Sequence, residues 1–276
     1  MRIRGLWVRY RGSRDWVLKD ISLELDRGLI LVVGRTGCGK STLARCIAGL
    51  IPKFFPAEIR GEIDVLGINP MVDGVEALAG KIAYLAQNPE MFIVSPSVLE
   101  EIVFPICNLG LPREEILDRL KRVVRELEIK ELLKQSTLAL STGQLQMVSI
   151  ASALATGAKV LVLDEPLARL DPNNAYVVAN LLRKIADKNR LVIVFEHHLD
   201  YIFELADEVA VLEDGKIKLR GKPREVIDRI TDVDIPEIAE IFHGLYLAKC
   251  IRSIPISVED AVRLVINHVK GRKHMV

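Results

Sequence analysis

The chain has 276 residues, enough for one α/β domain with a smaller appendage, and 50% of them are hydrophobic. Its 38 Lys and Arg nearly balance 37 Asp and Glu, and this net charge of +1 gives no electrostatic reason to expect nucleic acid as a partner. No segment approaches the ~20 apolar residues of a membrane span, and the N-terminus lacks the apolar segment of a secretory signal, so we expect a cytoplasmic location.

The N-terminal third of the chain predicts several strands and one helix. Residues 2–10 and 20–25 alternate between apolar and polar positions, as half-buried strands do. Residues 29–33 are all apolar and residues 81–86 form another short strand-like run, so both are expected to be strands. Between these two runs, a helix is expected to start near Lys40.

The middle of the chain, from about residue 97 to 156, has a helical pattern. We expect the helices to be broken at Pro105, Pro112 and Ser136. A helical segment placed between strand-like runs indicates a helical lobe inserted into the domain.

Apolar strands alternate with helices after this lobe. Residues 159–166 (KVLVLDEP) and 190–198 (RLVIVFEHH) are predicted strands, and a helix is expected to follow each, the first over about 172–187. Residues 208–221 predict a hairpin that turns at Asp214-Gly215. Fully apolar strands that alternate with helices predict an α/β fold with a parallel sheet covered on both faces.

The C-terminal segment, from about residue 222, changes to short helices. Residues 237–248 carry apolar side chains at helical spacing. Ser257 is placed as the N-cap of a second helix, with Asp260 three residues later. This tail either docks on its own domain or mediates self-association, and the sequence leaves both open.

The segment VVGRTGCGKSTL, residues 32–43, carries the clearest chemical signal. From Gly34 to Ser41 it fits the phosphate-binding pattern GxxxxGK[ST], between a predicted strand and a predicted helix. Glycines let successive backbone N–H groups point inward, and the helix N-terminus adds its positive end. The Lys40 charge suits the β- and γ-phosphates, and the Ser41 hydroxyl suits Mg²⁺. The candidate nucleotide contacts are Gly34, Thr36, Gly37, Cys38, Gly39, Lys40, Ser41 and Thr42.

Two acidic residues follow the apolar strand at 160–163. Asp164 lies where α/β sheets place their ligands, and we assign it to the Mg²⁺. Glu165 is the next residue and is placed to polarise the attacking water. In the alternative interpretation, both acids only cap the following turn.

The segment Leu140-Ser141-Thr142-Gly143-Gln144, just before a predicted helix, resembles the LSGGQ signature of ABC-type ATPases. Other motifs follow in the same order as in that family: Tyr10, Gln87, Ala168-Arg169-Leu170-Asp171 and His197. The resemblance covers about residues 2–221 and implies a P-loop NTPase ABC-type nucleotide-binding domain. It implies an N-terminal antiparallel β region, a helical subdomain over about 88–156, and a helical C-terminal extension over 222–276 that could serve dimerisation.

The resemblance also implies roles for residues around the bound nucleotide. Tyr10 stacks on adenine, with Trp16 as a second aromatic candidate, although either could instead pack in the core. Gln87 contacts Mg²⁺ or water and senses the γ-phosphate. His197 holds the γ-phosphate and the water in register, and Asp171 lines the contact between subunits.

A dimer is the functional unit that the resemblance implies. Ser141 and Gly143 of one subunit reach the γ-phosphate of ATP bound to the other, so two ATP molecules join a head-to-tail pair. Gln144 is a further nucleotide-binding residue of the signature. Hydrolysis of ATP to ADP and phosphate reopens the pair. The partner subunit is either a second copy or a related chain.

Several residues depart from the family pattern. Thr142 replaces a glycine of the signature and brings a Cβ to a place where backbones often approach closely. Leu167, Ala168 and Arg169 stand where the family usually has Thr, a small residue and Gly, and Met147 replaces a common basic residue. None of these changes removes a phosphate donor or the Mg²⁺ acid.

Within the family, residues 84–116 and the helical tail look most similar to ATPase subunits of energy-coupling-factor importers, which take up vitamins, cobalt or nickel. This resemblance implies a transmembrane partner, placing the chain at the cytoplasmic face of the membrane. Residues 87–111 would face that partner, or their apolar side chains pack inside the helical lobe. These side chains are Pro89, Met91, Phe92, Pro96 and Phe104.

Two other functions compete with transport. A soluble ABC-type ATPase that acts on translation or DNA usually carries two cassettes or a long coiled coil, and the sequence shows one cassette and no sustained heptads. A P-loop kinase of small molecules needs neither a signature motif nor a second subunit. The sequence does not identify a cargo.

Overall fold

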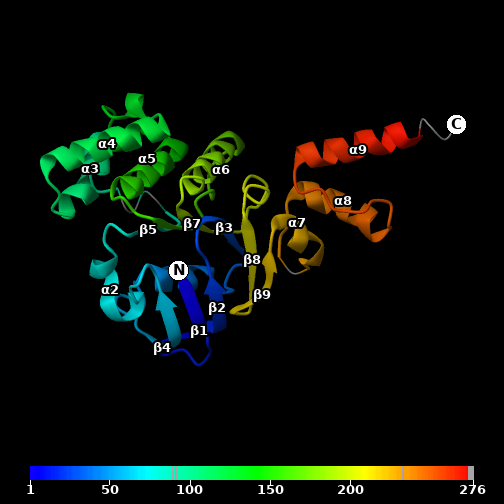
Figure 1. The fold of residues 1–276 in the computed structure, drawn as a ribbon, viewed down its shortest axis with the longest axis horizontal. Coiled ribbons are helices and arrows are strands. Elements are labelled where there is room, and N and C mark those ends of the chain that lie inside the picture. Colours follow the sequence, from blue (N-terminus) through cyan, green and yellow to red (C-terminus); the bar gives the residue numbers. More distant parts are fainter. Residues whose placement is uncertain (89, 91–92, 232, 273–276) are drawn as a thin grey trace.

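The computed structural model describes residues 1–88, 90, 93–231 and 233–272 (Figure 1). The strands are β1 (Arg2–Tyr10), β2 (Leu18–Glu24), β3 (Gly28–Val33), β4 (Ala57–Asp64), β5 (Ile82–Leu85), β6 (Val160–Asp164), β7 (Leu191–Glu196), β8 (Glu208–Glu213) and β9 (Lys216–Gly221). The α-helices are α1 (Lys40–Ile47), α2 (Pro70–Leu78), α3 (Val98–Asn108), α4 (Arg113–Leu127), α5 (Thr142–Ala155), α6 (Pro172–Ala186), α7 (Pro223–Val226), α8 (Glu237–Leu247) and α9 (Val258–Arg272).

A six-stranded sheet in the order β5-β6-β7-β3-β8-β9 forms the centre of the molecule. Its first five strands are parallel, and β9 pairs antiparallel with β8. Alternate residues of β3 face opposite sides: Leu29 and Leu31 pack in the core with α3 to α6, while Ile30 and Val32 pack in a second core with α1 and the N-terminal strands. The predicted α/β fold with a sheet covered on both faces is therefore confirmed.

A second sheet, in the antiparallel order β2-β1-β4, packs against α1 and the face of the main sheet that carries Ile30 and Val32. The sequence pattern did not predict β4 or the helix α2. Most β4 side chains are partly or fully exposed, so its apolar alternation is weak. A Cβ on Gly61 of β4 would lie 2.2 Å from the Gly5 carbonyl oxygen of β1, so this close strand approach requires glycine.

Helices α3, α4 and α5 form a helical lobe beside the main sheet (Figure 1). The expected break at Pro105 is wrong, because α3 continues through it to Asn108. Proline leaves the Glu101 carbonyl without its helical donor, and the Ser152 hydroxyl of α5 donates to that oxygen at 3.0 Å instead. Pro112 precedes α4 and Ser136 caps the short 3₁₀-helix Thr137–Ala139, as expected of helix boundaries.

The connection between β7 and β8 differs from the expected helix. Leu199, Ile202 and Phe203 have helical spacing and are buried, but the segment forms consecutive turns. Backbone bonds between residues three apart, such as Leu205 to Ile202 at 3.1 Å, close most of these turns. The hairpin at Asp214-Gly215 is confirmed, and both residues have the left-handed conformation that its turn needs.

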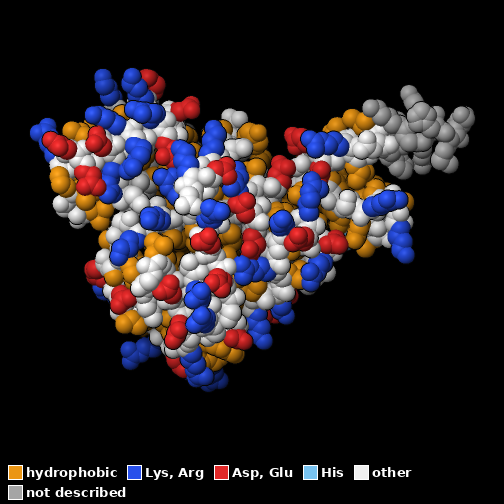
Figure 2. Space-filling view, viewed as in Figure 1, with side chains coloured by type: hydrophobic (Ala, Val, Ile, Leu, Met, Phe, Trp, Pro, Cys, Tyr) orange, Lys and Arg blue, Asp and Glu red, His pale blue; other side chains and the backbone are white. Residues whose placement is uncertain are grey.

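The C-terminal helices reach away from the body of the molecule, and α9 extends as an arm (Figures 1 and 2). Ser257 caps α9 by accepting the Asp260 N–H at 3.3 Å, and the Asp260 carboxylate pairs with Arg224 of α7 at 2.6 Å. The start of α9 is thus attached to its own chain, while self-association of the tail stays a prediction. Within the described residues, no helix is long and apolar enough to span a bilayer.

Candidate active site

The predicted site residues gather where adjacent strands of the main sheet end. The phosphate-binding loop follows β3, Asp164 ends β6, and Glu196 ends β7, which lies between them. Gln87 follows the neighbouring strand β5. This edge, at the carboxyl ends of parallel strands, is where α/β sheets bind ligands.

The loop from Gly34 to Lys40 has the conformation that its glycines permit. Gly37 and Gly39 have left-handed φ angles of 84° and 113°. A Cβ on Gly34 would lie 2.3 Å from the Leu212 carbonyl oxygen, and one on Gly39 would lie 2.7 Å from a Leu18 methyl carbon. The loop is therefore packed against β8 and β2, where larger residues would not fit.

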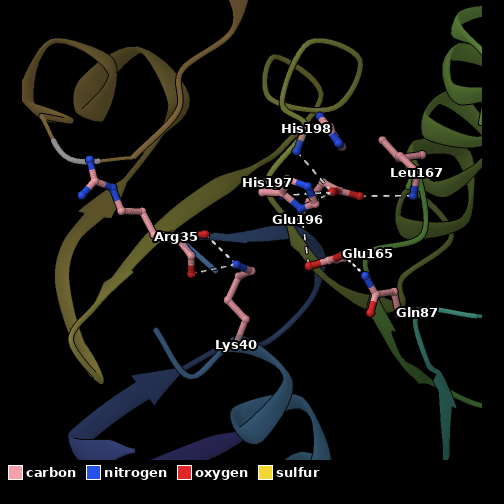
Figure 3. Close-up of polar contacts among 9 residues, drawn as sticks. Arg35, Lys40, Gln87, Glu165, Leu167, Glu196, His197 and His198 are labelled. Atoms are coloured by element: carbon pink, nitrogen blue, oxygen red, sulfur yellow. Dashed lines mark hydrogen bonds and ion pairs between the residues drawn. The ribbon is translucent and has the colours of Figure 1, made fainter. Parts of the chain in front are cut away.

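Lys40 is the first residue of α1 and is 5% exposed. Its ammonium donates to the carbonyl oxygens of Gly34 at 2.5 Å and Arg35 at 3.2 Å (Figure 3). These carbonyls hold the cation inside the loop without neutralising its charge. An anion in the loop would gain the full positive charge of Lys40.

Asp164 is a buried acid at 3% exposure, and burial raises its pKa above the usual range. A hydrogen bond with Ser41 opposes that rise, and the negative charge of Glu165 adds to it. The Asp164 Oδ1 atom is buried, and none of the described residues forms a hydrogen bond with it. An orphaned buried carboxylate oxygen beside a hydroxyl fits the oxygen ligands that Mg²⁺ prefers, so Ser41 and Asp164 could hold this ion.

Glu165, Gln87 and His197 lie together (Figure 3). The Gln87 amide donates to the Glu165 Oε2 atom. The His197 Nδ1 atom lies 3.4 Å from Glu165 Oε1, without hydrogen-bond geometry. Glu165 has a left-handed φ of 52°, which is uncommon for a residue other than glycine. The structure brings these three predicted residues into one cluster.

Glu196 is a site residue to which the sequence analysis assigned no role. It is fully buried, and its carboxylate accepts backbone N–H groups from His197 at 2.9 Å, His198 at 3.2 Å and Leu167 at 3.1 Å. Burial raises the pKa of Glu196, and these donors oppose the rise. Glu196 thus fastens the His197 backbone to the loop after Glu165. The sequence signal that could have identified Glu196 is its position as the one acidic residue at the end of an otherwise apolar strand, β7.

The two aromatic candidates for adenine lie on different sides of the N-terminal sheet. Tyr10 packs against the second core, and its hydroxyl lies 3.0 Å from the Thr42 hydroxyl in the first turn of α1. Trp16 packs edge-on against Trp7, with the Arg9 guanidinium 4.9 Å from its ring centre. Because Trp7 and Arg9 alternate with buried β1 residues, Trp16 lies on the outer face. Tyr10 is the candidate beside the phosphate-binding loop.

The LSTGQ segment begins α5, in the helical lobe. Ser141 is the N-cap and forms a reciprocal capping box with Gln144. Ser141 and Thr142 are exposed, while Gly143 is buried, and a Cβ on it would lie 2.4 Å from the Asn174 side chain. The Asn174 amide in turn donates to Asp171 at 2.5 Å.

The loop that leads to Asp171 contains Arg169, which has a left-handed φ of 66°. Arg169 stands where the resembled family usually has glycine, so this chain keeps a glycine-like conformation with a side chain. Asp171 caps α6 by accepting the N–H groups of Asn173 and Asn174, each at 3.1 Å. The cap thus holds the C-terminal end of this loop at the start of α6.

Comparison with known proteins gives one consistent result. The family model described as "ABC transporter" matches residues 18–168, more than half of the chain. A putative ABC transporter ATP-binding protein of Methanosarcina mazei is 36% identical over 83% of this chain. The matched region covers only 39% of the length of the Methanosarcina protein. A protein of the same description from Pyrococcus horikoshii is 35% identical, with 83% of this chain and 82% of the relative covered.

Solved structures with the same fold include two that cover most of this chain. cbiO1 from Clostridium perfringens, described as part of the ABC transporter complex cbiONQ, has a TM-score of 0.76 and 28% identity over 89% of this chain and 94% of its own. A dimeric ATP-binding cassette bound to ADP and phosphate has a TM-score of 0.67 over 81% of this chain and 98% of its own. At 22% identity, the latter shows the fold alone.

Proposed function

Because the chain belongs to the ABC transporter family, we propose that it is the ATP-hydrolysing subunit of a membrane importer, driven by closure and reopening of a head-to-tail dimer. The family match and the cassette homologues indicate an ATPase. One observation carries the proposal. Lys40, Asp164 and Glu165 share the edge of the main sheet, whereas the exposed Ser141 lies at the start of α5 in the helical lobe.

Each residue at the sheet edge has a chemical role in the proposed reaction. Lys40 binds the terminal phosphates, since carbonyl oxygens are the only partners of its buried charge within the part of the chain that the structure describes. Glu165 orients the attacking water and accepts its proton, and Gln87 and His197 hold Glu165 and the γ-phosphate in position. Ser41 and Asp164 would hold Mg²⁺, with Gln87 as a further contact. Bound Mg²⁺ supplies neutralisation of phosphate charge.

The proposed dimer places Ser141, Gly143 and Gln144 of one subunit over the nucleotide of the other. The N-terminus of α5 would offer its N–H groups and positive dipole to the γ-phosphate. Exposure of Ser141 and Thr142 in the single chain supports this arrangement. Tyr10 would stack on the adenine, and Asp171 would line the contact between subunits.

The transmembrane partner is proposed to bind the helical lobe. Described apolar side chains are exposed there: Val94 at 63%, Leu99 at 41%, Phe104 at 47% and Leu138 at 94%. Pro96 is also exposed, while Pro89, Met91 and Phe92 lie outside the described residues. The likeness to cbiO1, part of a transporter complex, supports a partner of this kind. A vitamin or transition-metal ion as cargo rests on the resemblance to energy-coupling-factor ATPases.

Purification from membranes tests the proposal. The tagged chain should retain an integral membrane protein in detergent, and Phe104→Asp with Leu138→Asp should release it. Leu245→Asp on α8, which also alters an exposed leucine, is the matched control and should leave the complex intact. A chain that purifies without a membrane protein, or with ribosomes or DNA, would instead indicate the soluble class of ABC-type ATPase.

A further inference from the structure

Glu101 is a buried carboxylate that the proposed mechanism does not use. It lies in α3 at 5% exposure, and no Lys, Arg or His of the described residues forms an ion pair with it. A buried charge without a counter-ion is costly unless hydrogen bonds compensate. Its Oε2 atom accepts the backbone N–H groups of Val94 at 3.0 Å and Ser95 at 2.9 Å.

The main chain of α3 is tied to α5 at the same residue. Since Pro105 cannot donate to the Glu101 carbonyl, the hydroxyl of Ser152 in α5 occupies that oxygen at 3.0 Å. Glu101 therefore joins two neighbours at once: its side chain holds residues 94–95, and its backbone holds the helix that begins at the signature.

A second link connects residues 95–96 to the chain just before the signature. The Thr137 hydroxyl, in a side chain that is 4% exposed, donates to the Ser95 carbonyl at 2.7 Å. The Thr137 N–H donates to the Pro96 carbonyl at 3.1 Å. Ser141, the N-cap of α5, follows four residues after Thr137.

These links hold residues 94–96 against the start of the signature helix. We infer that Glu101 and Thr137 are positioning residues that set the place of Ser141, which this chain would offer to the nucleotide of its partner. This inference rests on the proposed dimer.

Matched substitutions test the inference in a Glu165→Gln background, which is expected to hold an ATP-bound dimer. Thr137→Val removes the hydroxyl with little change of shape, and Thr137→Ser keeps it. Glu101→Leu removes the side-chain oxygen that accepts the Val94 and Ser95 N–H groups, and Glu101→Gln keeps one side-chain oxygen as an acceptor. The ATP concentration at half-maximal dimerisation is measured by light scattering, and the affinity of the monomer for Mg-ADP by calorimetry.

We expect Thr137→Val and Glu101→Leu to raise the dimerisation midpoint at least fivefold while Mg-ADP affinity stays within twofold. The Ser and Gln variants should stay within twofold of the parent in both. Amide exchange of residues 138–144 in the nucleotide-free protein should accelerate at least fivefold in the Val and Leu variants only. An unchanged midpoint would overturn the inference, even if residues 94–95 exchanged faster.

A parent that fails to dimerise with ATP would contradict the proposed function separately. In that case, exchange of residues 138–144 in the monomer decides the inference alone. Faster exchange in the Val and Leu variants would support the link, and unchanged exchange would overturn it.

Discussion

At the scale of single residues, the site is a set of charges that the fold leaves incompletely satisfied. Among the described residues, Lys40 bonds to carbonyl oxygens only, and one oxygen of Asp164 has no hydrogen-bond partner. Buried groups in this state cost stability, which a ligand of matching charge can restore. The proposed nucleotide with Mg²⁺ would be such a ligand.

Lys40→Ala should weaken nucleotide binding. Charge-assisted hydrogen bonds contribute about 1.5–3 kcal/mol each, so we expect roughly a 10- to 100-fold rise in the dissociation constant. Calorimetric titration of Mg-ATP into the variant measures this change. Lys121→Ala, at an exposed lysine of α4, should bind as the unmodified chain does. Equal affinity of the Lys40 variant would contradict the assigned phosphate contact.

Asp164→Asn should stabilise the nucleotide-free protein near neutral pH. Because burial raises the folded-state pKa of Asp164, the stability that this group contributes is present at low pH and lost as the pH rises through the folded pKa. The asparagine amide carries no charge and avoids that loss, so the unfolding temperature of Asp164→Asn should exceed that of the unmodified chain at about pH 8. The two unfolding temperatures should approach each other near pH 4, around the usual pKa of Asp.

The same variant should lose the Mg²⁺-dependent part of stabilisation by ATP. Asp26→Asn, at an exposed aspartate, is the control and should behave like the unmodified chain at both pH values. Thermal unfolding with and without Mg-ATP provides the measurement. A lower unfolding temperature for Asp164→Asn near pH 8 would show that the carboxylate is satisfied in the folded chain.

At the scale of elements, the signature helix is positioned by contact with the start of α6. Gly143 lies against Asn174, whose backbone and side chain both bind Asp171. The two motifs that would face the partner subunit are therefore packed on each other within one chain. A change of volume at Gly143 should disturb both.

Gly143→Ala should lower stability by about 1–3 kcal/mol, as overpacking of a close contact does, and should reduce the ATPase rate. Adding Asn174→Ala removes the two nearest atoms, at 2.4 and 2.6 Å, but keeps the Asn174 Cβ at 2.9 Å, so it should restore part of the stability. Gly244→Ala in α8 is the matched control, since its Cβ meets open space. Chemical unfolding compares the unmodified chain, Gly143→Ala, Asn174→Ala, the double variant and Gly244→Ala, and additive losses in the double variant would contradict the contact.

The sequence predicted those elements whose pattern comes from burial. Strands β3, β6 and β7 are entirely buried and read directly as apolar runs. Strand β4 was missed because its side chains are mostly exposed. The turns after His198 were mistaken for a helix because buried residues at helical spacing do not require helical hydrogen bonds. The helix break expected at Pro105 was wrong because the hydroxyl of Ser152, which is remote in sequence, donates to the Glu101 carbonyl in place of the missing proline N–H.

The site shows the same division between local and long-range information. The loop at Gly34–Ser41 and the acids Asp164 and Glu165 follow from motifs, and the structure places them on one sheet edge. Glu196 acts through backbone N–H groups from two loops, which no local pattern reveals. The roles of Lys40, Asp164 and Glu165 in binding and catalysis stay predictions, which the variants of these residues test.

At the scale of the whole molecule, one chain carries two parts of the proposed nucleotide site: Lys40 and Glu165 at the edge of the main sheet, and Ser141 at the start of α5 in the helical lobe (Figure 1). We propose that these parts meet between two subunits, in a dimer in which each signature completes the other subunit's nucleotide site.

Light scattering of Glu165→Gln with saturating Mg-ATP tests this claim most directly. Loss of the water-polarising carboxylate should slow hydrolysis by roughly 10²–10⁴-fold and trap the closed state, giving a particle of twice 30.8 kDa. Adding Ser141→Arg to the same chain should keep it monomeric, because the bulky cation would occupy the γ-phosphate contact. A Glu165→Gln chain that stays monomeric, or a dimer that persists with Ser141→Arg, would contradict the account.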